Sequence, residues 1–157
     1  MGIYAGQTAV SAERSKGEIE ATLRRYGATG FQYATDATRA MVAFQMKGKV
    51  IRFLVPMPQV KDYMMSAPDR RGYTRRRTPA QAEGIVEQET RQRWRALALG
   101  IKAKLETVSS GITQFEAEFL AHFVLPGGKT VAETLLPELE ALYKSGKAPT
   151  LGWDGPK

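Results

Sequence analysis

Side chains suited to acid–base or nucleophilic chemistry are few in this 157-residue chain. It has one histidine, His122, and no cysteine, so thiolate nucleophiles and zinc sites of the cysteine type are excluded. His122 stands between Phe119 and Phe123 beside an apolar helical face, which favours a packed histidine over a catalytic one. A serine–histidine pair would need His122, and no G-x-S-x-G sequence occurs.

Phosphate-loop and metal patterns are also incomplete. The run from Gly127 to Thr130, GGKT, resembles the end of a phosphate-binding loop, but Phe123 stands where the first glycine is needed. Glu116 and Glu118 are two residues apart, so a helix would point them to different faces. The spacing of the carboxylates gives no support to a magnesium site. We therefore expect a protein that is not an enzyme and has no cofactor and no metal site.

Arginines with interleaved tyrosines form the one pattern that indicates a ligand. Residues 57–78 read as a long basic loop with five arginines, and a loop of this length favours a functional segment. Cations suit phosphates and aromatic rings suit unstacked bases, so the pattern favours nucleic acid. An arginine-rich loop can also be a solvated surface without a partner. The candidate contacts, including basic residues of the following helix, are Arg70, Arg71, Tyr73, Arg75, Arg76, Arg77, Arg91, Arg95 and Lys102.

The net charge of +7 is concentrated in this part of the chain. Residues 69–104 hold ten Lys/Arg and four Asp/Glu, a net charge of +6. Residues 1–68 carry +4, and residues 105–157 carry −3. A basic centre beside an acidic C-terminal segment indicates a polyanionic partner. Arg75, Arg76 and Arg77 also precede a helix start, where cations are unfavourable and an anion would resolve the conflict.

The elements that must position these residues follow from periodicity and capping signals. In residues 91–108, apolar side chains recur at helical spacing, and Trp94 lies inside that stripe, so we expect it in the core. Thr78, proline at the next position and Gln81 form a capping box, which predicts one long helix over residues 79–110. Ser15 and Glu18 have the same form and predict an earlier helix that ends at Gly27.

Residues 31–55 predict an antiparallel sheet. Phe31 and Tyr33 alternate with polar or small residues, residues 36–38 resemble a turn, and residues 39–55 read as a β-hairpin around Gly48. The fold class is therefore α+β, a three-stranded antiparallel sheet packed on the long basic helix. Additional C-terminal helices are expected over residues 113–124 and 130–143, the second broken by Pro137.

We expect residues 1–157 to form a single domain in four parts. Residues 1–56 hold a helix and the sheet, residues 57–78 the basic loop, residues 79–145 the helical part and residues 146–157 a tail. No apolar run reaches the length of a membrane span and no signal peptide is evident. A chain without cysteine fits the reducing cytoplasm, so we expect a cytoplasmic protein.

Two stretches carry a resemblance, "LRRYG" within residues 23–27 and "RQRWRALALGIKAK" over residues 91–104. With the sequence around them, over most of residues 11–145, they resemble a family of small, uncharacterised proteins encoded by phages and prophages. The resemblance implies a context in phage DNA metabolism or in dealing with host defence, and it assigns no catalytic residue. The order of elements is also similar to the core of phage single-strand annealing proteins, by analogy of layout only.

These observations favour a non-enzymatic nucleic-acid-binding protein of phage type. Single-stranded DNA, bound without sequence preference, is the favoured partner. The alternative is a protein-binding module, such as a phage inhibitor of a host defence complex, with a protein partner of host origin. The sequence leaves open DNA against RNA and whether the chain forms a homo-oligomer.

Overall fold

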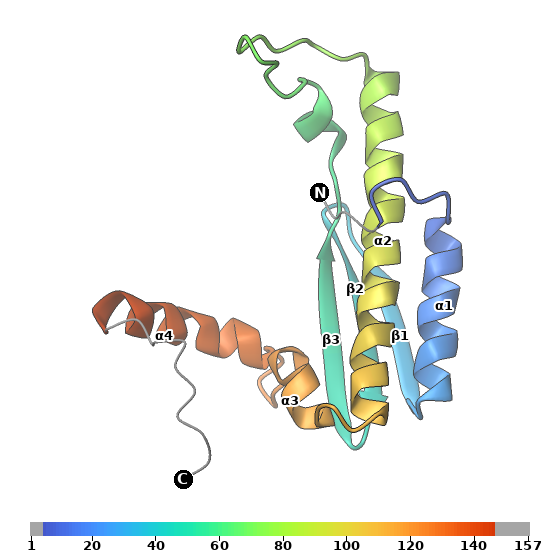
Figure 1. Ribbon diagram of the computed structural model, residues 1–157, viewed down its shortest axis with the longest axis vertical. Coiled ribbons are helices and arrows are strands. Elements are labelled where there is room, and N and C mark those ends of the chain that lie inside the picture. Colours follow the sequence, from blue (N-terminus) through green and yellow to red (C-terminus); the bar gives the residue numbers. More distant parts are fainter. Residues whose placement is uncertain (1–4, 147–157) are drawn as a thin grey trace.

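The computed structural model describes residues 5–146, and Figure 1 shows a three-stranded sheet with two helices on one face and a separate C-terminal helix. Most of the expected tail, residues 147–157, lies outside the described residues. The elements, in chain order, are α1 (Ala12–Arg25), β1 (Gly30–Thr35), β2 (Arg39–Met46), β3 (Lys49–Pro56), the 3-10 helix η1 (Val60–Tyr63), α2 (Pro79–Ser109), α3 (Phe115–Phe119), the 3-10 helix η2 (Leu120–His122) and α4 (Val131–Ser145).

The sheet has the strand order β1-β2-β3, and both pairs are antiparallel. Lys47 and Gly48 join β2 to β3 in a two-residue turn, and both have positive φ angles, 50° and 73°. This is the backbone that a tight hairpin matching the strand twist requires. In both strands of the hairpin the buried side chains alternate with more exposed ones. The sheet is therefore apolar toward one face, as the alternation predicts.

Helices α1 and α2 pack together and cover that apolar face. Val42, Phe44 and Ile51 of the sheet are almost fully buried in one cluster with Ile19 of α1 and Trp94 of α2. The prediction that Trp94 belongs to the core is confirmed, because its side chain is 2% exposed. The predicted fold class is also confirmed, since the sheet packs on a long helix and further helices follow.

Helix α2 begins where the sequence predicts. Thr78 Oγ1 accepts a hydrogen bond from the Gln81 amide, and Gln81 Oε1 accepts one from the Thr78 amide. Its 31 residues end at Ser109, and Gly111 follows with a φ of 74°.

The predicted start of α1 is wrong by one turn. Ser11 caps the helix, because its side chain accepts a hydrogen bond from the Arg14 amide. Ser15 instead lies inside the helix and is fully buried. The sequence offers two serines four residues apart, and burial of the apolar face selects the earlier one as the cap.

The C-terminal helices differ from their predictions in opposite ways. The predicted helix 113–124 is short, with one α-helical turn and one 3-10 turn, because Phe123 leaves it to bridge to Ile51 at the edge of β3. The predicted break at Pro137 is absent, and α4 is continuous. Pro137 and Glu133 are both exposed, so water can hydrate the Glu133 carbonyl that proline leaves without a donor.

Candidate nucleic-acid interface

Residues 57–78 form what we call the basic arm, which lies beyond the end of the sheet beside the first turns of α2 (Figure 1). It was predicted as a loop, and its only regular features are η1 and one isolated antiparallel bridge between Met65 and Arg76. After η1, residues 64–77 fold back as a short two-stranded ribbon. The Ser66 amide bonds the Arg75 carbonyl at 2.8 Å, and the Arg77 amide bonds the Met64 carbonyl at 2.7 Å.

A tight turn at Asp69 closes the tip of this ribbon. Asp69 Oδ1 accepts hydrogen bonds from the amides of Arg71 and Tyr73, at 2.8 and 3.0 Å. The Gly72 amide bonds the Asp69 carbonyl at 2.9 Å, and Gly72 has a φ of 82°. Aspartate at the first position of a turn and glycine at the fourth are the expected residues of this geometry. That spacing was the signal in the sequence that could have revealed the ribbon.

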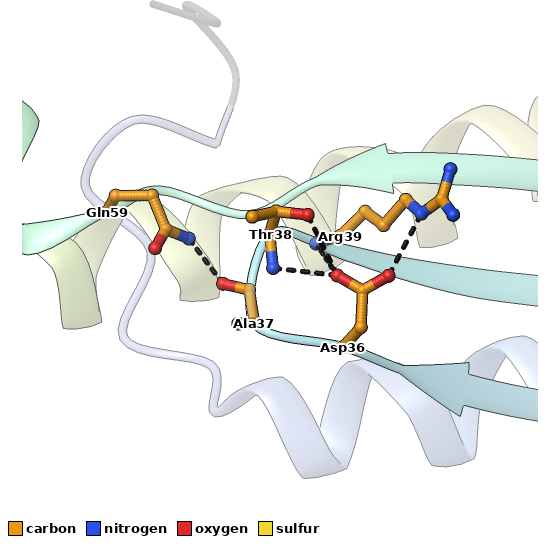
Figure 2. A network of polar contacts seen from close by, with 5 residues as sticks. All are labelled: Asp36, Ala37, Thr38, Arg39 and Gln59. Carbon is orange, nitrogen blue, oxygen red and sulfur yellow. Dashed lines mark hydrogen bonds and ion pairs between the residues drawn. The ribbon is translucent and has the colours of Figure 1, made fainter.

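The base of the arm is tied to the turn between β1 and β2, as Figure 2 shows. Gln59 Nε2 donates to the Ala37 carbonyl at 2.6 Å, and the Met57 amide donates to the Thr38 carbonyl at 2.8 Å. Asp36 holds this turn by accepting hydrogen bonds from the Thr38 backbone and side chain and from Arg39. These bonds keep the pKa of the Asp36 carboxyl well below its usual range. Helix α2 also holds the chain just before the arm, because the Arg93 guanidinium donates a hydrogen bond to the carbonyl of Pro56, the last residue of β3.

Four arginines of the arm are free to meet a ligand. Arg70, Arg71, Arg75 and Arg76 are exposed, and no carboxylate in residues 5–146 forms an ion pair with them. Tyr73 lies among them with 70% of its surface exposed. The ribbon, with five arginines and one aspartate, carries a net charge of +4. Asp69 accepts backbone amides and forms no ion pair with an arginine of the ribbon within residues 5–146.

Arg77 differs from its neighbours, because its side chain holds the ribbon together. Its Nη1 donates to the Tyr63 carbonyl at 2.9 Å and to the Met65 carbonyl at 2.7 Å. A guanidinium with these partners has fewer donors for a phosphate. Arg77 therefore positions the arm more than it extends its charged surface.

The start of α2 offers fewer free backbone amides to an anion than the sequence predicts. Pro79 has no amide hydrogen, the Gln81 amide bonds Thr78 Oγ1, and the Ala82 amide bonds the Thr78 carbonyl. In the described part of the chain this leaves the Ala80 amide of the first turn without a partner. Any anion at this point is therefore held mainly by arginine side chains.

The predicted contacts on α2 are not brought to the arm. Arg91 pairs with Glu87 at 3.3 Å, and Arg95 pairs with Glu18 of α1. Lys102 is exposed, but it lies 25 residues after Arg77, which is roughly 37 Å along a helix. The nine predicted residues thus divide into an exposed set on the arm, a structural arginine, two ion-paired arginines and a distant lysine.

The single histidine of the chain is engaged in packing. The His122 ring stacks on Phe53 with centroids 4.0 Å apart, and burial lowers the pKa of the imidazole. Across residues 5–146 no group of three or more histidine and acidic side chains is placed to hold a metal ion. No helix of the same residues is long and apolar enough to cross a membrane.

Comparisons of the chain with protein-family models, with curated proteins and with solved structures give no match.

Proposed function

We propose that this chain is a non-enzymatic nucleic-acid-binding protein of phage or prophage type, and that the basic arm is its binding surface. The observation that carries the proposal is the gathering on one ribbon of Arg70, Arg71, Arg75 and Arg76, which are exposed and form no ion pair within residues 5–146. Cations that form no ion pair can neutralise phosphates without first breaking internal contacts, and here the hydrogen bonds of the ribbon hold their backbone in place. The proposal places the contacts on the arm rather than along α2.

Single-stranded DNA is the partner that the arm favours. Tyr73 is exposed at the tip, next to Arg71 and the turn glycine Gly72. An exposed ring beside cations suits stacking of an unpaired base, which every base can provide. Apart from Lys61, Asp62 and Asp69, the arm's charged side chains are arginines, and we propose that they contact phosphates, which carry no sequence information. Binding is therefore proposed to be independent of sequence.

The test is the affinity for a fluorescent single-stranded oligonucleotide, measured by anisotropy over a range of salt concentrations. The double variant Arg75→Ala/Arg76→Ala removes two exposed charges and leaves Arg77 in place. We expect weaker binding and a salt slope that falls by about 0.7 for each lost phosphate contact. The matched control, Arg25→Ala/Lys129→Ala, removes two exposed charges at the other end of the molecule and should change the slope little.

Two results would overturn the proposal. One is an affinity of the arm variant equal to that of the parent, with the fold checked by circular dichroism. The other is saturable binding that does not change with salt. Tyr73→Ala separates the strand type, because loss of stacking should weaken single-strand binding while leaving duplex binding unchanged. Failure to bind any oligonucleotide would overturn it as well and would favour the alternative, a protein partner.

A further inference from the structure

Besides Tyr73, the ribbon exposes one other large apolar side chain, that of Met65. Half of the Met65 surface is exposed, although the residues around it on the ribbon are mostly polar or charged. Met65 lies directly opposite Arg76, since these two residues form the isolated antiparallel bridge. Arg76 is exposed and forms no ion pair with a carboxylate of residues 5–146.

The backbone around the bridge brings the two side chains close together. Two hydrogen bonds flank the bridge, one on each side, from the Ser66 amide to the Arg75 carbonyl and from the Arg77 amide to the Met64 carbonyl. This pattern makes Met65 and Arg76 a non-hydrogen-bonded pair, in which the Cα atoms are only about 4.5 Å apart. The two side chains therefore lie side by side on one face of the ribbon.

The opposite face of the ribbon is turned toward the body of the arm. Side chains alternate along an extended strand, so Met64 and Arg77 lie on the face away from Met65 and Arg76. The Arg77 side chain donates to the carbonyl of Tyr63, the last residue of η1, and Met64 is half-buried. The face with Met65 and Arg76 is thus the one that points away from η1.

We propose that Met65 and Arg76 together form a platform that binds one unpaired base of the nucleic acid. The plane of an arginine guanidinium stacks on bases, and the polarizable thioether of methionine makes favourable contacts with aromatic rings. Every base has such a ring face, so the platform reads no sequence. This inference rests on the proposed function, which it deepens by adding a base contact to the phosphate contacts.

The platform and Tyr73 bind two different bases of the same strand. Arg76 follows Tyr73 by three residues, which is at most roughly 10 Å of extended chain, whereas stacked bases are about 3.4 Å apart. Stacking does not withdraw Arg76 from the phosphates, because its N–H groups lie in the plane of the guanidinium and point past the edge of the base.

The first experiment compares a single-stranded oligonucleotide with an abasic strand of equal length, which keeps the phosphates and lacks the bases. Met65→Ala should weaken binding of the base-bearing strand about threefold to tenfold. Its salt slope should not change, since no cation is lost, and its affinity for the abasic strand should equal that of the parent. Equal weakening on both strands, or no weakening, overturns the inference alone. A parent that binds neither strand overturns the proposed function and the inference with it.

The second experiment observes the contact directly through isotope-labelled methionine methyl groups. The chain has six methionines, and the Met65 signal is identified by its loss in Met65→Leu. We expect the Met65 methyl signal to move upfield when the base-bearing strand binds, because the methyl group lies over the face of a ring, and to stay in place with the abasic strand. Met64, the neighbour on the opposite face, is the matched control. An unmoved Met65 signal in a saturated sample, or equal shifts of both signals, overturns the inference.

Discussion

At the scale of single residues, the buried hydroxyl of Ser15 lowers the free energy of unfolding. Its side chain is fully buried in α1, and its Oγ has no hydrogen-bond partner among residues 5–146. An unsatisfied buried polar group costs about 1–3 kcal/mol, and alanine is also the better helix former. We expect Ser15→Ala to raise the free energy of unfolding by about 1 kcal/mol, measured by urea denaturation.

Ser110 provides the control for this change. Its Oγ donates to the Glu106 carbonyl at 2.6 Å at an exposed helix end. Ser110→Ala therefore removes a satisfied hydroxyl and should not stabilise the protein. A Ser15→Ala variant that is less stable than the parent would indicate a partner for the hydroxyl that the fold does not reveal.

The sequence predicts some residue roles better than others, and the difference is physical. Trp94 follows from helical periodicity, because burial of a stripe depends only on local spacing. The roles of Arg77 and Arg95 depend on contacts distant in the sequence, with the Tyr63 carbonyl and with Glu18. Composition shows that a segment is basic, but it does not show which cations the fold has already used.

At the scale of elements, Arg77 is the residue on which the ribbon of the arm depends. It is the only one of the three consecutive arginines whose side chain bonds backbone carbonyls within the described residues. We expect Arg77→Ala to speed hydrogen exchange of the Ser66 and Arg75 amides, which lie in the ribbon, while the thermal midpoint changes little. Met57 at the base of the arm packs against the central core, but among the described residues the core includes no side chain of the ribbon, residues 64–77, so loss of the ribbon's hydrogen bonds should stay local.

Arg76→Ala is the matched control, because it removes the same charge from the next position and breaks no described bond. Equal exchange rates in the two variants would mean that the backbone bonds alone hold the ribbon. The comparison also separates a loss of charge from a loss of order when oligonucleotide affinities are measured.

The elements themselves follow from the sequence where local signals agree. The long helix, the hairpin and the capping boxes at Thr78 and Thr130 combine spacing with the correct terminal residues. The sequence analysis did not predict the ribbon, because its two segments show no alternation of apolar and polar residues. Only the turn from Asp69 to Gly72 indicates it. The length of the predicted helix over residues 113–124 was overestimated. Phe123 fits the helical spacing of the apolar residues, yet it packs at the edge of β3.

At the scale of the whole molecule, the direction in which α4 leaves the sheet is the feature that could not be predicted from the sequence. An apolar stripe over residues 135–143 predicts a buried face in any compact arrangement. The structure leaves it exposed, since the contacts of Val131 and Thr130 fix only the start of the helix. Tertiary geometry therefore leaves the apolar stripe of this amphipathic helix exposed within residues 5–146.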